Sequence, residues 1–69
     1  MKTHVRRRRF ERGEMSQAQL AEKVAVSRQT IIAIERGDYN PSVKLALQLA
    51  AALDTTVDAL FELEAGDVG

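Results

Sequence analysis

The chain has 69 residues with a hydrophobic content of 45%, so it can form one small domain that buries only about 60% of the surface it exposes when unfolded. It contains no cysteine and a single histidine, which excludes disulfides, thiolate metal sites and a cysteine nucleophile, and leaves His4 unable to form a zinc site alone. The net charge is zero, which at first argues against a nucleic-acid partner.

The charges are, however, unevenly distributed along the chain. Residues 1–13 carry six basic side chains and one acidic one, whereas residues 42–69 carry one basic and five acidic side chains. This polarity is typical of a molecule with one electropositive face, although a basic run is also common on plain solvated surface. No apolar segment of signal-peptide type follows the basic N-terminus, and the longest apolar stretch, 45–53, is too short to cross a membrane. We therefore expect a cytoplasmic protein without a membrane partner.

The first predicted helix covers about residues 4–12 and is the least regular of the five. Its helical spacing from Val5 passes through arginines, so the helix has no complete apolar stripe. We expect it to pack through Val5, Phe10 and the aliphatic stems of its arginines, and to end at Gly13. His4 is expected to be an exposed N-terminal side chain.

The second predicted helix covers about residues 17–23. Ser16 and Gln19 form a capping box at its start, in which each side chain bonds to the backbone of the other residue. Leu20 and Ala21 give this helix an inner face, and the small Ala21 lets another helix approach closely.

The third predicted helix covers residues 28–36. Ser27 is a good N-cap, and Gly37 can take the left-handed conformation that ends a helix. Ile31 and Ile34 lie on one stripe, which predicts that this side packs inward. Only three residues separate the second helix from Ser27, so the two helices must cross at a steep angle as a helix-turn-helix.

Two further helices complete the predicted fold. Ser42 caps a helix over about 43–53 that supplies most of the core. Its core residues are Val43, Leu45, Ala46, Leu49, Ala50 and Leu53. Thr56 caps a fifth helix that ends near residue 61 or 63, and residues 64–69 are expected to fray. The sequence thus predicts an all-α fold without strands: one domain over 1–69, a compact bundle of five short helices with its core at about 5–63.

The stretch from Gln17 to Gly37, with the segment 39–42 and the apolar residues that follow it, resembles the phage-repressor and Cro-like (xenobiotic-response-element-type) helix-turn-helix family. The resemblance covers about residues 5–61. Small or apolar residues stand where the motif needs them: Ala21, Val26, Ile31 and Ile34. The chain is similar in particular to small stand-alone prokaryotic regulators. The resemblance implies a lambda-repressor-like DNA-binding domain whose helix-turn-helix consists of the second and third helices.

In that family the second helix of the motif lies in the major groove of DNA. The resemblance implies that the base-contacting residues are Arg28, Gln29, Ala33 and Ile32. Arginine and glutamine match guanine and adenine edges, and Ile32 or Ala33 can meet a thymine methyl group. The alternatives are that Arg28 and Gln29 are ordinary solvated surface, and that Ile32 packs against the first helix or a second subunit.

Phosphate contacts fix the register of such a protein on DNA. The resemblance implies that these contacts come from Ser16, Gln17, Thr30, Arg36, Tyr39 and Asn40. Glu35 is expected to pair with Arg9 inside the fold, because an acid that faces phosphates would repel them. The other arginines of the run 6–9 are expected to be solvated or near phosphate.

The chain departs from the family pattern in two places. Ala25 stands where the family usually has glycine, which predicts a left-handed alanine in the turn. Arg8 stands where relatives usually have an apolar residue. Either its stem lies along the fifth helix, or Glu14 is an extra residue that shifts the register of the first helix.

The resemblance implies a transcriptional regulator that binds double-stranded DNA with sequence specificity. Of the kinds of regulator, we expect a repressor. One recognition helix gives a small interface, so we expect a homodimer on a palindromic operator with half-sites roughly 34 Å apart. The candidate interface residues are Leu60, Phe61 and Leu63; the alternative is that they close the core.

A second hypothesis is an antitoxin or adaptor-type interaction module, whose acidic C-terminal part binds a partner and whose DNA binding is secondary. An enzyme is not expected, because the sequence shows no carboxylate pair, no nucleophile with a base, no metal cluster and no phosphate loop. We accordingly predict no catalytic residue, no metal and no cofactor, and nothing in the sequence specifies a small-molecule effector.

Overall fold

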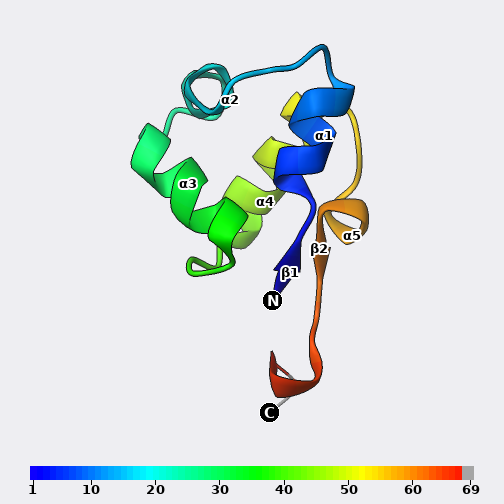
Figure 1. Cartoon of the computed structure of the whole chain (residues 1–69). Helices are drawn as coiled ribbons and strands as arrows, with labels where there is room; N and C mark the ends of the chain where they lie inside the picture. Colours follow the sequence, from blue (N-terminus) through cyan, green and yellow to red (C-terminus); the bar gives the residue numbers. More distant parts are fainter. Residues whose placement is uncertain (68–69) are drawn as a thin grey trace.

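The computed structural model describes residues 1–67, in which a bundle of short helices is joined to a small sheet (Figure 1). The helices are α1 (Val5–Glu11), α2 (Gln17–Lys23), α3 (Arg28–Arg36), α4 (Val43–Ala52) and α5 (Val57–Leu60). The prediction of an all-α bundle with five short helices is confirmed. No helix in this part of the chain is long and apolar enough to cross a membrane.

Side-chain caps determine where four of the helices begin. In each case a hydroxyl oxygen accepts a hydrogen bond from the backbone N–H three residues further on, which satisfies a donor that the helix itself leaves unpaired. These caps are Ser16, Ser27, Ser42 and Thr56. The capping box before α2 is complete, since the backbone N–H of Ser16 also donates to the side chain of Gln19 at 2.8 Å. Gly37 ends α3 with a φ of 80°.

The core lies between all five helices and consists of aliphatic side chains. Its members are Val5, Leu20, Ala21, Val24, Ile31, Ile34, Leu45, Leu49, Ala50, Leu53 and Leu60. Two predicted core residues are on the surface instead: Phe10 is 51% exposed and Val43 is 78% exposed. In α1 the inward positions belong to Val5 and Arg9, so Phe10 faces outward. In α4, Leu45 and Leu49 face the core, which leaves Val43 on another side of the helix.

Two short strands pair the N-terminal segment with the segment that follows α5. The prediction of a fold without strands was therefore wrong. Strand β1 (Lys2–Thr3) pairs antiparallel with β2 (Phe61–Glu62). The imidazole of His4 bonds to the carboxylate of Glu62 and lowers the pKa of that carboxyl, so His4 is not the freely exposed side chain that the sequence suggests. Residues 65–67 form a 3₁₀ turn, η1 (Ala65–Asp67), within the segment expected to fray, and residues 68 and 69 of that segment lie outside the described part.

Arg8 binds the C-terminal end of α4. Its Nε donates to the carbonyl of Leu53 at 2.8 Å, and its Nη2 donates to the carbonyl of Asp54 at 2.7 Å. Carbonyls at a helix C-terminus lack intrahelical partners and carry partial negative charge, so a guanidinium stabilises them. The main contact of Arg8 therefore differs from both explanations that the sequence suggests. The additional residue Glu14 lies in the turn between α1 and α2 and has a φ of 59°.

The turn between α2 and α3 contains the predicted left-handed alanine, since Ala25 has a φ of 56°. A side chain in this conformation costs about 1 kcal/mol relative to glycine. We therefore expect Ala25→Gly to raise the thermal unfolding midpoint, which calorimetry measures. Ala51→Gly, at an exposed site inside α4, is the matched control and should lower the midpoint. A midpoint that Ala25→Gly leaves unchanged or lowers would contradict strain in the turn.

Candidate nucleic-acid interface

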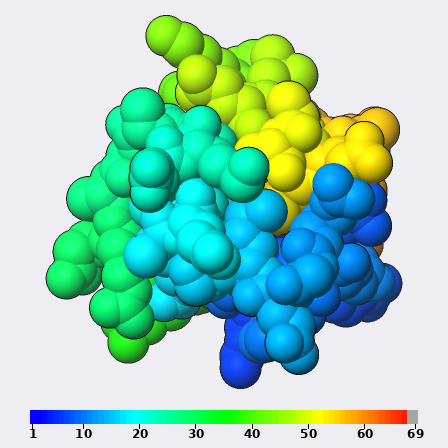
Figure 2. Space-filling model, turned by 90° about the horizontal axis from the view of Figure 1, so that it is seen from above, coloured from blue at the N-terminus to red at the C-terminus, as the bar shows by residue number. Residues whose placement is uncertain are grey.

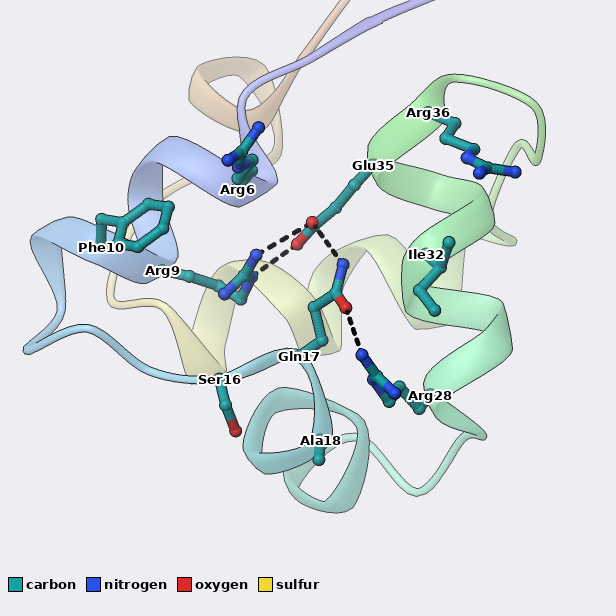
Figure 3. A pocket seen from close by; sticks show the side chains of 10 residues that line it. All are labelled: Arg6, Arg9, Phe10, Ser16, Gln17, Ala18, Arg28, Ile32, Glu35 and Arg36. Atoms are coloured by element: carbon teal, nitrogen blue, oxygen red, sulfur yellow. Dashed lines mark hydrogen bonds and ion pairs between the residues drawn. The ribbon is translucent and has the colours of Figure 1, made fainter.

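A groove of about 660 Å³ lies between α1, the start of α2 and the outer side of α3. Figure 2, which looks at the molecule from above, shows α2 (cyan) between α1 (blue) and α3 (green). Ten residues line the groove (Figure 3): Arg6, Arg9, Phe10, Ser16, Gln17, Ala18, Arg28, Ile32, Glu35 and Arg36. Four of these residues are arginines and one is an acid, so the groove is electropositive although the whole chain is neutral.

A buried ion pair between Arg9 and Glu35 forms the floor of this groove, as the sequence predicts. The guanidinium binds the carboxylate in a bidentate manner, with Nε to Oε2 at 2.6 Å and Nη2 to Oε1 at 3.0 Å. The two side chains are 7% and 6% exposed. Arg9 also donates from Nη1 to the carbonyl of Met15 at 2.7 Å. The pair therefore connects α1 to α3 and to the turn before α2.

Gln17 extends this pair to the protein surface. Its side-chain Nε2 donates to Glu35 Oε1 at 3.1 Å, and its Oε1 accepts from Arg28 Nη2 at 3.4 Å (Figure 3). A continuous set of hydrogen bonds thus runs from buried Arg9 to exposed Arg28. Gln17 therefore connects the buried pair to Arg28 at the mouth of the groove.

All four residues predicted to contact bases lie on α3. Arg28 and Gln29 are exposed, and Ile32 and Ala33 are half-buried. Arg28 and Ile32 line the groove, while Gln29 and Ala33 lie outside its lining. Ile31 and Ile34, on the opposite side of α3, are fully buried. One side of α3 therefore packs into the core, and the other side is accessible to solvent. The sequence predicts this burial of Ile31 and Ile34.

The six residues predicted to contact phosphate do not all lie together in the structure. Ser16, Gln17 and Arg36 line the groove. Thr30 bonds through its hydroxyl to the Ser27 hydroxyl at 3.0 Å. The other two, Tyr39 and Asn40, are exposed in the loop after α3 and lie outside the lining of this groove, and Asn40 lines a separate, apolar groove.

Arg6 and Phe10 of α1 also line this groove. The sequence analysis placed Arg6 among the arginines expected to be solvated or near phosphate, and it expected Phe10 to pack the first helix, but it did not bring the two together at one site. Arg6 and Phe10 are four residues apart, which places them on the same side of a helix. This spacing could have identified them as neighbours at one site.

The three predicted interface residues differ in exposure. Leu60 is 1% exposed and closes the core, which is the alternative considered for it. Phe61 is half-buried, and Leu63 is 72% exposed. A second, apolar groove contains Phe61 together with Val43 and Leu47 of α4. The sequence analysis missed Leu47, which is 58% exposed and lies one turn after Val43.

Comparison with known proteins gives consistent similarities. A family model described as helix-turn-helix matches residues 7–60. A helix-turn-helix-type transcriptional regulator of Methanothermobacter thermautotrophicus is 53% identical over 53 residues, which cover 77% of this chain and 75% of the relative. The regulator YgzD of Bacillus subtilis is 45% identical over 64 residues, covering 93% of this chain and 96% of the relative.

Two solved structures have a similar fold. The N-terminal DNA-binding domain of SinR from Bacillus subtilis is similar with a TM-score of 0.73 and 32% identity, covering 88% of both chains. A chain in a complex of the SinR and SinI proteins is similar with a TM-score of 0.75 and 30% identity. The match covers 94% of the present chain but 63% of that one, so the present chain spans less than two thirds of its length.

The ion pair at the floor of the groove makes a stability prediction. Glu35→Ala leaves the Arg9 guanidinium buried without its carboxylate, which should reduce the free energy of unfolding by about 3–5 kcal/mol. Urea denaturation measures this loss, and Glu35→Gln provides a milder variant if the alanine variant is unfolded. The control is Glu22→Ala, which removes an exposed carboxylate of α2 and should change stability by less than about 0.5 kcal/mol. Equal stabilities of the Glu35 and Glu22 variants would contradict a buried pair.

Proposed function

Since this chain belongs to the helix-turn-helix family of DNA-binding transcriptional regulators, we propose that it is a repressor that inserts α3 into the major groove of a palindromic operator as a homodimer. The observation that carries the proposal is the amphipathic placement of α3. Its N-terminal half presents Arg28 and Gln29 to solvent, above the buried Ile31 and Ile34. We also propose that the chain acts in the cytoplasm. The relatives described above come from an archaeon and a bacterium, and a DNA-binding regulator of a prokaryote acts in that compartment.

In this proposal the residues that contact DNA divide into two roles. Arg28 and Gln29 read base edges, and Ile32 and Ala33 contact the bases through apolar surface, because these side chains lie on the outer side of α3. The phosphate contacts come from residues around the start of α2, the end of α3 and the loop that follows it. They are Ser16, Gln17, Thr30, Arg36, Tyr39 and Asn40. The side chain of Gln17 is bonded to Glu35 and Arg28, so its role toward DNA includes the orientation of Arg28.

The apolar face of the chain supports dimerisation. We define this face by Val43, Leu47 and Phe61, which line the apolar groove, and we propose that the exposed Leu63 extends it. Three of its members are exposed large hydrophobic residues: Val43 (78%), Leu47 (58%) and Leu63 (72%). Exposed apolar surface of this kind marks an interaction site. The apolar groove and the electropositive groove have no lining residue in common, so a two-fold contact through the apolar face leaves both copies of α3 free for DNA.

A protein partner other than a second copy is the competing occupant of this face. One of the similar structures is a complex of SinR with SinI, and an adaptor or antitoxin role for the present chain would place a partner there. The oligomeric state of the purified chain distinguishes the two proposals, because a homodimer needs no second protein.

Selection of binding sites from random duplex DNA tests the proposed function. Wild-type protein should enrich a palindromic consensus with half-sites roughly one helical turn apart. Arg28→Ala should lose base preference at one position of each half-site and keep the others. Arg36→Ala, as the matched control, should weaken binding to all sequences alike. A uniform loss with Arg28→Ala would show that Arg28 contacts phosphate, and no enrichment by wild type would overturn the proposal.

The apolar face makes a separate prediction. Leu47→Glu places a charge at its centre and should weaken dimerisation at least about tenfold, since a buried unpaired carboxylate is strongly unfavourable. Sedimentation analysis over a range of protein concentrations measures this change. Gln48→Glu is the control, because it introduces the same charge at the next exposed position of α4, which lies outside the apolar groove. If both variants dimerise as wild type does, the interface lies elsewhere.

A further inference from the structure

Arg6 lies on α1, outside the helix-turn-helix, and it lines the electropositive groove opposite α3. Figure 3 shows its side chain on one wall of the groove, with Ile32 and Arg36 of α3 on the other wall. Arg7, the next residue of α1, is absent from the groove lining and its side chain is 75% exposed. Two adjacent arginines of one helix therefore have different surroundings. Of these two, Arg6 shares a surface with α3 and Arg7 does not.

The charge of Arg6 is not compensated within the described residues. Between positions 1 and 67 the other α1 arginines each lie within ion-pair distance of an acid: Arg7 and Arg8 of Glu11, and Arg9 of Glu35. No such pair forms for Arg6, Arg28 or Arg36 in this part of the chain. The single carboxylate of the groove, Glu35, is already neutralised by Arg9. The groove thus presents three positive charges without acidic partners.

The exposed ring of Phe10 holds Arg6 at this position. The guanidinium carbon of Arg6 lies 5.8 Å from the centre of the ring, and that of Arg9 lies 5.5 Å from it. A guanidinium over an aromatic face is attracted by the ring quadrupole, which reduces the freedom of the side chain. The ring of Phe10, which is 51% exposed, therefore favours a position of Arg6 beside the groove.

We propose that Arg6 is a further contact to DNA, and that its ligand is a phosphate of the backbone strand that runs beside the groove. The inference rests on the proposed function, because it requires that α3 faces DNA. A guanidinium suits this ligand since it is always charged and donates in a fixed fork that matches phosphate oxygens. Arg6 would extend the binding surface from the helix-turn-helix onto α1 and would not contribute to base preference.

The salt dependence of DNA binding tests this contact. Each phosphate that a cationic side chain neutralises contributes about 0.9 to the slope of log K against log salt. Arg6→Ala, and Arg6→Gln as a variant of similar size, should reduce the slope by about this amount and weaken binding to every duplex alike. Arg6→Lys should keep most of the slope. Arg7→Ala removes the same charge one position away and should leave the slope nearly unchanged.

The outcomes separate this contact from the proposed function. Equal slopes for the Arg6→Ala and Arg7→Ala proteins, in a wild type that binds DNA, would overturn the contact and leave the function intact. A wild type that binds no duplex at low salt would overturn both. A change in base preference with Arg6→Gln would also overturn the assignment to phosphate.

Discussion

The bidentate pair between Arg9 and Glu35 holds together the helices that form the electropositive groove. It joins α1 to α3 at 2.6 and 3.0 Å, and Gln17 connects it to the first turn of α2. Removing two charges from water is costly, so such a pair contributes less to net stability than the aliphatic core around it. Its effect is on arrangement, because the bidentate geometry is satisfied only when the three helices lie in one relative position.

That arrangement also positions the side chains which face outward. Gln17 bonds to Glu35 with one end of its amide and to Arg28 with the other, so the orientation of an exposed arginine depends on a buried carboxylate. Side chains that are ordered before binding lose less entropy when a ligand arrives. The residues at the floor of the electropositive groove therefore organise it. The neutral net charge of the chain hides this groove, because half of the ten acidic side chains lie in the C-terminal third.

The sequence predicted those features of the fold that depend on local chemistry. The helix caps and the bounds of α2 and α3 follow from hydrogen bonds within a few residues. The left-handed Ala25 was expected from its place in the helix-turn-helix motif. Features that depend on distant parts of the chain were missed. The two-residue strands are too short for an alternating pattern, and Arg8 reaches carbonyls that are 45 and 46 positions away. Val43 was assigned to the core because α4 is apolar on several sides, so periodicity alone could not identify the inward one.

We propose that one face of the molecule, formed by α3, the start of α2 and Arg6 of α1, binds DNA. Titration of ¹⁵N-labelled protein with a short duplex, followed by two-dimensional NMR, locates the contact surface. We expect that the amide and arginine side-chain signals that shift belong to this face, while those of Leu47 and Phe61 move only with the oligomeric state. Shifts centred on α4 and α5, with Arg28 and Arg6 unaffected, would contradict it.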